Sequence, residues 1–191
     1  VDLGRSGHLL IAGGERLGRS TALLTCIGAL SARDRGTRFV VLAPRRSPLR
    51  SLEVRGPVVR TAVSPGEIAD ALDWVESEAG AGGRIALVAD DCESLPQEVA
   101  PALSRILRRG RETGVHGLFA GQPSDLCRLY EDWVRYLRSR RTGVLLGPDP
   151  ADADLFDLRL PTVQVARIPG RGYLVDGPDL VPLQVALTTA G

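Results

Sequence analysis

Methionine and lysine are both missing from this sequence of 191 residues, and each absence carries information. Because there is no Met, even at residue 1, we expect the chain to be a segment excised from a longer polypeptide. Because there is no lysine, all 24 basic residues are arginine, a bias that is typical of a GC-rich genome. A single arginine therefore needs independent support before it is assigned a role.

Long apolar runs and metal-binding cysteine patterns are also missing. No apolar run approaches the roughly 20 residues of a transmembrane helix, so we expect no membrane span in this segment. Cys26, Cys92 and Cys127 follow no zinc-ligand spacing and are interpreted as structural thiols, which favours a reducing, cytoplasmic compartment. The formal net charge of +1 provides no overall attraction to nucleic acid or membrane, and it disfavours DNA as a partner.

Short apolar runs alternate along the chain with stretches of helical periodicity. Strands are predicted over 8–12, 38–44, 84–91, 115–121, 142–147 and 170–177, and helices over 20–34, 65–79, 96–114 and 125–141. The last helix is predicted to be continuous, with one apolar face made of Leu126, Leu129, Tyr130, Trp133, Val134 and Leu137. This alternation is typical of a single α/β domain over 1–191 with a mainly parallel sheet, whose ligands bind beyond the carboxyl ends of the strands.

A glycine-rich stretch, "GGERLGRST", joins the first predicted strand to the first helix. Gly13, Gly18 and Ser20 match the spacing G-x-x-x-x-G-K-[ST] of a phosphate-binding loop, but Arg19 stands in place of the lysine. The candidate nucleotide-binding residues are Gly13, Gly14, Glu15, Arg16, Leu17, Gly18, Arg19, Ser20 and Thr21. Such a loop binds phosphate through backbone N–H groups and the positive end of the helix. The alternative is a glycine-rich turn that only packs the helix onto the sheet.

Two later stretches supply acidic and polar residues at strand ends. "IALVADD" places Asp90 where a Walker B aspartate binds Mg²⁺ together with Ser20, and it places Asp91 where many ATPases carry a catalytic glutamate. "FAGQP" places Gln122 where a polar residue senses the γ-phosphate. The alternative is that Asp90 and Asp91 only cap a turn. If no nucleotide binds, two arrangements are expected as alternatives: the loop collapses onto Arg19, or Arg19 forms an ion pair with Asp90.

The motifs resemble, in order and across nearly the whole chain, those of the FtsK/SpoIIIE family of RecA-like ring ATPases. "GHLLIAGGERLGRSTALLTCIGAL" is similar to the first strand, loop and helix of that family, and "RIALVADDCESL" to its Walker B element. "GRETGVHGLFAGQPSDL" and "PGRGYLV" resemble later stretches. The doubled aspartate and "GRETGVH" look most like the later ATPase modules of the EccC proteins, the motors of actinobacterial type VII secretion. FtsK-type proteins fused to forkhead-associated domains carry similar modules.

The resemblance implies a RecA-like P-loop NTPase fold and a set of partners. The module would belong to a membrane-anchored chain with several ATPase modules and would lie at the cytoplasmic face as a soluble domain without direct membrane contact. Its partners would be the other modules of that chain, further copies in a ring oligomer, and small helical-hairpin secretion substrates recognised through a C-terminal signal. In this family, terminal modules can be degenerate in catalysis.

Three functions remain open from the sequence. The first is a degenerate module that binds nucleotide weakly or not at all and serves substrate recognition or motor assembly. The second is an active ATPase that uses ATP and Mg²⁺ to move peptide or DNA, and the third is a nucleotide-free interaction scaffold. Arg19 and Asp91 depart from the family pattern at the same catalytic step, because Arg is not equivalent to Lys and Asp is shorter than Glu. These departures favour the first function.

The remaining polar and aromatic residues are interpreted as structural. His8, His116, Trp74 and Trp133 lie in predicted strands and helices without a nucleophile or acid pattern around them. Arg108, Arg109 and Arg111 are interpreted as a solvated helix end, with an arginine-finger role as the alternative.

Overall fold

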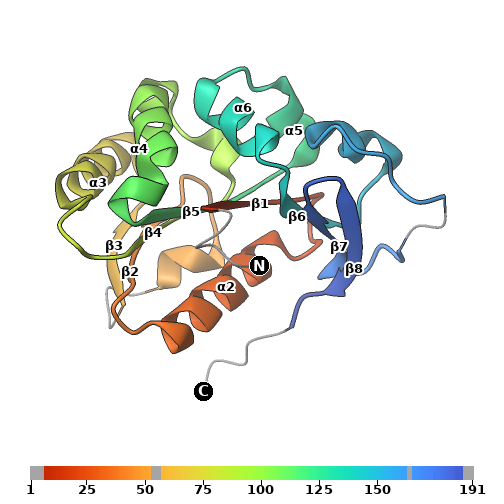
Figure 1. The fold of residues 1–191 in the computed structure, drawn as a ribbon, viewed down its shortest axis with the longest axis horizontal. Helices are drawn as coiled ribbons and strands as arrows, with labels where there is room; N and C mark the ends of the chain where they lie inside the picture. The colour runs from red at the N-terminus through yellow and green to blue at the C-terminus, as the bar shows by residue number, and fades with distance from the viewer. Residues whose placement is uncertain (1–6, 53–56, 163–164, 187–191) are drawn as a thin grey trace.

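The computed structural model describes residues 7–52, 57–162 and 165–186 of the chain. An eight-stranded sheet with the strand order β3-β2-β4-β5-β1-β6-β7-β8 forms the middle layer (Figure 1). Its strands are β1 (His8–Gly13), β2 (Arg38–Leu42), β3 (Val58–Ala62), β4 (Ile85–Ala89), β5 (Val115–Gly121), β6 (Thr142–Leu146), β7 (Arg171–Asp176) and β8 (Asp179–Gln184). The first six strands are parallel, and β7 and β8 are added in antiparallel orientation. The predicted α/β class is confirmed.

Helices cover both faces of the sheet. The helix α2 (Arg19–Arg33) lies on one face, and α3 (Pro65–Glu78), α4 (Ala100–Thr113), α5 (Pro123–Arg128) and α6 (Asp132–Ser139) lie on the other (Figure 1). Side chains of a strand point alternately to the two faces, so Leu10 joins the apolar core beneath α4 and α6, whereas Ile11 joins the core beneath α2. None of these helices is both long and apolar enough to cross a bilayer, as far as the described residues show.

The predicted ends of α3 are confirmed. Ser64 is the N-cap and forms a capping box with Glu67, because each side chain binds the backbone N–H of the other residue. Pro65 occupies the first helical position, where its missing N–H leaves no bond unmade. Beyond the end of the helix, Gly80 has a φ of 88°, a left-handed conformation that glycine adopts without strain.

The helix predicted over 125–141 is wrong in one respect, because the structure contains two helices there. Residues Leu129 and Glu131 have extended backbone between α5 and α6, and Tyr130 is 85% exposed instead of sharing the apolar face. Packing against another part of the chain accompanies the new direction, since Trp133, Val134 and Leu137 of α6 are buried in the apolar core that α6 shares with α4. Periodicity does not reveal a break that no glycine or proline marks.

Two strands were not predicted from the sequence. The strand β3 is an edge strand whose middle residues are half-buried, and β8 is an edge strand that is mostly exposed and contains Pro182. Edge strands need no continuous apolar run, because only one side is paired and little of their surface is buried. Their formation depends on the neighbouring strands β2 and β7.

Candidate functional site

The candidate residues meet at the carboxyl edge of the parallel strands. The strand β5 lies between β1 and β4, so the loop after β1, the acids after β4 and Gln122 after β5 end side by side. This arrangement follows from strand order, because parallel strands end at the same edge of a sheet. The structure therefore brings together the loop 13–21 with Asp90, Asp91 and Gln122, as the sequence predicts.

The glycine-rich loop turns tightly from β1 into α2. A Cβ atom on Gly13 would lie 2.9 Å from the Cβ of Leu146, so this position accepts only glycine without movement. Gly18 has a φ of 95° and Arg16 a φ of 60°, so two of the loop residues are left-handed. Leu17 is buried, whereas Glu15 and Arg16 are exposed at the tip of the loop. The loop is thus anchored by an apolar side chain near its end.

Arg19, at the start of α2, forms hydrogen bonds through both terminal nitrogens of its guanidinium. Its Nη1 donates to the carbonyl of Gly13 at 2.8 Å, and its Nη2 donates to Oδ1 of Asp91 at 2.7 Å. The exposed fractions of the Arg19 and Asp91 side chains are 14% and 16%, so this ion pair is largely shielded from solvent. The expected pairing of Arg19 with Asp90 is wrong, because other donors surround the Asp90 carboxylate.

Asp90 is 1% exposed and accepts three hydrogen bonds. Ser20 donates to its Oδ2 at 2.7 Å, Ser47 donates to the same oxygen, and the backbone N–H of Asp91 donates to its Oδ1 at 3.2 Å. A hydroxyl and a carboxylate this close fit the oxygen donors that Mg²⁺ prefers, and Mg²⁺ bound there would polarise phosphate oxygens. Ser20 and Asp90 are the residues that would hold the ion.

Ser47 was not predicted as a site residue. It is the N-cap of a short helix, η1 (Pro48–Ser51), and its Oγ accepts a hydrogen bond from the N–H of Leu49 at 3.1 Å. Arg50 fixes the preceding turn by donating to the carbonyls of Ala43 and Pro44. The sequence signal was a Ser-Pro pair shortly after a buried strand, but only strand order shows that β2 ends beside β4.

Asp91 begins the short helix η2 (Cys92–Ser94) and has a left-handed backbone with a φ of 48°. Its carbonyl accepts a hydrogen bond from the N–H of Ser94 at 2.8 Å, so the turn predicted after the two acids forms through the backbone. Burial raises the pKa of Asp91, the charge of Asp90 raises it further, and the charges of Arg19 and Arg45 act in the opposite direction.

Glu93 is a third acid at this edge that sequence reasoning missed. Its two carboxylate oxygens are buried and have no hydrogen-bond partner with good geometry among the described residues. The carboxylate lies over the end of β5, since a Cβ atom on Gly121 would be 2.6 Å from its Oε2. Burial raises the pKa of Glu93, while its own backbone amide and the charge of Arg19 act in the opposite direction. Gln122 itself is half-buried and is the N-cap residue of α5.

The histidines have structural contacts, as predicted. The carbonyl of Leu107 can only accept, so Nε2 of His8 donates to it at 2.8 Å, while Nδ1 accepts from the N–H of Gly117 at 2.9 Å. Both ring nitrogens are therefore satisfied by neutral imidazole. Burial lowers the pKa of His8 to about 4. His116 contacts the carbonyl of Gly7.

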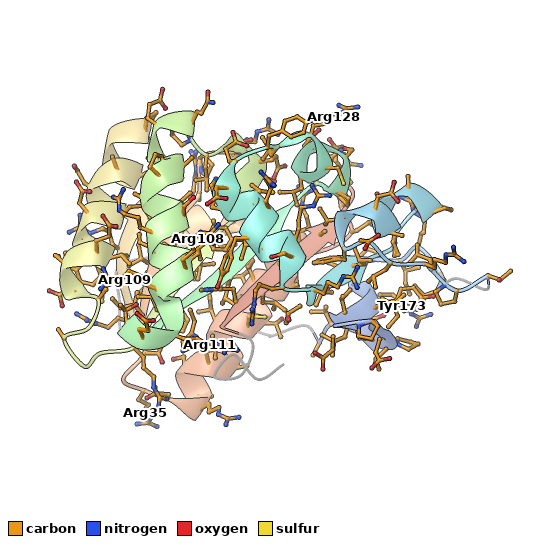
Figure 2. The ribbon with its side chains drawn as sticks, turned by 45° about the horizontal axis from the view of Figure 1, so that its top comes forward. Arg35, Arg108, Arg109, Arg111, Arg128 and Tyr173 are labelled. Atoms are coloured by element: carbon orange, nitrogen blue, oxygen red, sulfur yellow. The ribbon has the colours of Figure 1, made fainter. Side chains whose placement is uncertain are left out.

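The arginines of α4 lie far from the glycine-rich loop of their own chain. Arg108, Arg109 and Arg111 occupy the half of the helix that ends near the amino end of β5 (Figure 2). Arg108 pairs with Asp132, and its guanidinium lies 5.2 Å from the ring centre of Tyr136. Arg108 is therefore a surface residue of α4 that contacts α6 of its own chain.

No protein-family model matches the sequence, and no curated protein sequence matches it. Solved structures with the same fold do exist. The cytoplasmic domain of the Thermomonospora curvata type VII secretion ATPase EccC matches with a TM-score of 0.81 and 19% identity, over 100% of this chain and 25% of that chain. ATPases 2 and 3 of the same protein, in complex with a signal sequence peptide, match with a TM-score of 0.78 and 20% identity, over 100% of this chain and 38% of that chain.

A third structure contains ATPases 2 and 3 of EssC from Geobacillus thermodenitrificans. It matches with a TM-score of 0.76 and 16% identity, over 97% of this chain and 38% of that chain. The chain therefore spans between a quarter and two fifths of the length of these three neighbours. At this level of identity the likeness establishes the fold. The chain has the α/β, RecA-like P-loop fold of the ATPase domains of EccC and EssC.

Proposed function

We propose that this chain is a degenerate ATPase module of a type VII secretion motor of the FtsK/SpoIIIE type. It binds nucleotide weakly or not at all and contributes to substrate recognition or to assembly of the motor. The observation that carries the proposal is the contact of Arg19 with both Gly13 and Asp91. This contact engages the residue at the Walker A lysine position and the residue at the Walker B glutamate position at the same time.

The contact weakens phosphate binding because it competes with it. To reach phosphate, Arg19 must leave a carbonyl and a carboxylate, and a hydrogen bond to a charged group contributes roughly 1.5–3 kcal/mol. Lysine has three N–H donors on one nitrogen instead of a rigid planar fork, so it is held less firmly between Gly13 and Asp91, and its compact ammonium reaches the β- and γ-phosphates directly. The loss corresponds to an affinity about ten to a hundred times lower than that of a lysine-containing loop.

Hydrolysis is affected by the same contact. A general base must lie within hydrogen-bond distance of the attacking water, and Asp91 already uses one carboxylate oxygen to bind Arg19. Its side chain is also one methylene shorter than the glutamate of many ATPases. Asp90 has three hydrogen bonds from the protein itself, so this carboxylate is satisfied without Mg²⁺. The candidate site is therefore stable as a structural element.

The partners follow from the fold neighbours. One neighbour is a pair of EccC ATPase modules in complex with a signal sequence peptide, which supports signal recognition as a task for modules of this fold. We therefore propose that the chain works beside other ATPase modules of one polypeptide, at the cytoplasmic face of the membrane. Helical-hairpin substrates with a C-terminal signal are its proposed ligands, and a ring oligomer is its proposed assembly.

Isothermal titration of the chain with ATP and Mg²⁺, together with steady-state phosphate release, tests the proposal. We expect weak heat or none for the wild type, and an affinity at least about tenfold higher for Arg19→Lys, which removes the fork. Arg35→Lys is the matched control, because Arg35 is exposed in the turn between α2 and β2.

Each outcome separates one function from the others. Turnover of the wild type near 1 s⁻¹, roughly the low end of typical enzymes, would identify an active translocase and refute the proposal. If neither the wild type nor Arg19→Lys releases heat at millimolar ATP, a nucleotide role is refuted and the third function, a nucleotide-free interaction scaffold, is supported instead. If Arg19→Lys and Arg35→Lys increase the affinity for ATP equally, the Arg19 contact is not the cause of weak ATP binding.

A further inference from the structure

The segment 165–170 packs against the glycine-rich loop at Gly14, Leu17 and Gly18. Hydrogen bonds to residues on β7, β8 and the loop hold it in place, one of them from Nε2 of Gln184 to the carbonyl of Pro169 at 3.1 Å. The N–H of Val165 donates to the hydroxyl of the buried Tyr173 at 3.0 Å, and the N–H of Gly170 donates to the carbonyl of Leu17 at 2.9 Å. The carbonyl of Gly170 accepts from the N–H of Val185 at 2.7 Å. Figure 2 shows Tyr173 within the β7 and β8 region that supports this segment. The segment is therefore a fixed wall of the loop.

Arg167 lies in the middle of this wall and faces the first residues of the loop. Its Nη2 is 3.8 Å from the position that a Cβ atom on Gly14 would occupy, and its Cα is 3.6 Å from the corresponding position on Gly147. The backbone of Arg167 is thus packed against the end of β6, and its guanidinium is beside the loop backbone. Gly14 has no side chain that would separate the guanidinium from a ligand on the loop.

The guanidinium of Arg167 is available to bind an anion, whereas the guanidinium of Arg19 is not. Arg167 pairs with Asp149, and the exposed fractions of the two side chains are 52% and 56%. Exposed ion pairs of this kind contribute only about 0–1 kcal/mol, so an incoming anion displaces the carboxylate at little cost. Arg19, by contrast, is shielded and bound on both prongs.

Phosphate is the anion that fits this position. A guanidinium binds two phosphate oxygens with two parallel hydrogen bonds, as it binds a carboxylate. The loop adds the positive end of α2, a helix that begins at Arg19 immediately after the left-handed Gly18. A polyphosphate on the loop would therefore meet the helix on one side and Arg167 on the other.

We propose that Arg167 is a phosphate-contacting residue of this site, which binds the polyphosphate part of a ligand lying on the loop 13–18. The ligand class is a di- or triphosphate, either free or attached to a nucleoside. The assignment rests on the proposed function, in which Arg19 stays with Asp91 and Arg167 provides the cation instead. Arg167 lies outside the glycine-rich motif in the sequence.

Titration calorimetry of the chain with sodium tripolyphosphate, ATP and adenosine tests the assignment. The titrations are done in EDTA, so that only the protein and the anion interact. We expect Arg167→Ala to weaken tripolyphosphate and ATP binding about tenfold, the effect of one charged hydrogen-bonded contact, and to leave adenosine unaffected. Asp149→Asn removes the competing charge but keeps a good N-cap residue for η4 (Pro150–Leu155), and we expect it to tighten binding about two- to threefold. Arg35→Ala removes an equal charge far from the loop.

The outcomes distinguish this assignment from the proposed function. Equal losses for Arg167→Ala and Arg35→Ala would show a general charge effect and overturn the assignment, as would no binding of tripolyphosphate to the wild type at about 10 mM. Either result leaves the degenerate module intact. Fast ATP turnover by the wild type would refute the degenerate module but not the assignment. The Arg167 contact would then still be tested by comparing the tripolyphosphate and ATP affinities of the wild type, Arg167→Ala and Arg35→Ala. Asp149→Asn provides the decisive test if Arg167→Ala has an altered melting temperature. If Asp149→Asn increases the affinity for ATP but not for tripolyphosphate, the nucleoside determines the binding, and this result contradicts the assignment.

Discussion

His8 links β1, the strand that precedes the glycine-rich loop, to the rest of the core, and acidification acts on this link. The ring lies between the carbonyl of Leu107 in α4 and the N–H of Gly117 in β5. Protonation of Nδ1 would place a second N–H against the N–H of Gly117 and leave that donor without an acceptor. The ring also lies 5.9 Å from the ring of Tyr136 in α6. We therefore expect the domain to lose stability when the pH falls.

The magnitude follows from the difference in pKa between the two states. His8 has a pKa of about 4 in the folded chain and an ordinary value of 6.5 when unfolded. Because the folded pKa is the lower one, the unfolded state binds more protons, and stability is fully present above pH 6.5 and is lost as the pH falls toward 4. Linkage between pH 7 and pH 5 gives a loss of about 2 kcal/mol, or roughly 4–8 °C in melting temperature for a chain of this size.

Urea unfolding of the wild type and of His8→Gln at pH 7 and pH 5 measures this effect. Glutamine keeps a hydrogen-bond donor and an acceptor but has no proton to gain in this range. Acids such as Asp91 and Glu93 titrate in both proteins, so their contributions cancel in the difference. His116→Gln is the matched control, because His116 is only half-buried and contacts Gly7. If the difference between wild type and His8→Gln changes by less than about 0.5 kcal/mol over this range, the assigned burial effect is wrong.

Two substitutions at the carboxyl edge of the sheet test the local geometry by urea unfolding. We expect Gly13→Ala to destabilise the domain by about 1–3 kcal/mol, because its Cβ would meet the Cβ of Leu146 at 2.9 Å and the carbonyl oxygen at 3.1 Å. Gly66→Ala in α3 has no atom within 4 Å of the new Cβ and should be neutral or stabilising, so equal losses would contradict this reasoning. Ser47→Ala should cost about 1–2 kcal/mol, because it removes both the bond to Asp90 and the N-cap of η1, whereas Ser51→Ala, whose hydroxyl donates to the carbonyl of Pro48, should cost less. An unchanged midpoint for Ser47→Ala would show that the Ser20 contact suffices.

Local sequence patterns predicted much of the fold. Buried parallel strands such as β4 are continuous apolar runs, and the glycine spacing from Gly13 to Gly18 sets a tight turn into a helix, so both can be recognised within a few residues. The break between α5 and α6 was missed because the packing that buries Trp133, Val134 and Leu137 of α6 against α4 joins segments that are distant in the sequence. Edge strands were missed because they bury too little to need an apolar pattern.

The sequence by itself determined the type and order of the elements that form the carboxyl edge of the sheet. It also determined that arginine replaces lysine in the loop and that two adjacent acids follow β4. Only the tertiary structure decided which acid Arg19 binds, because the Asp90 carboxylate is already bound by Ser20, Ser47 and the N–H of Asp91. The contacts of Ser47 with Asp90 and of Arg167 beside Gly14 likewise depend on strand order and on distant segments. Such contacts arise only when the chain folds, since nothing in the local sequence specifies partners that are many residues away.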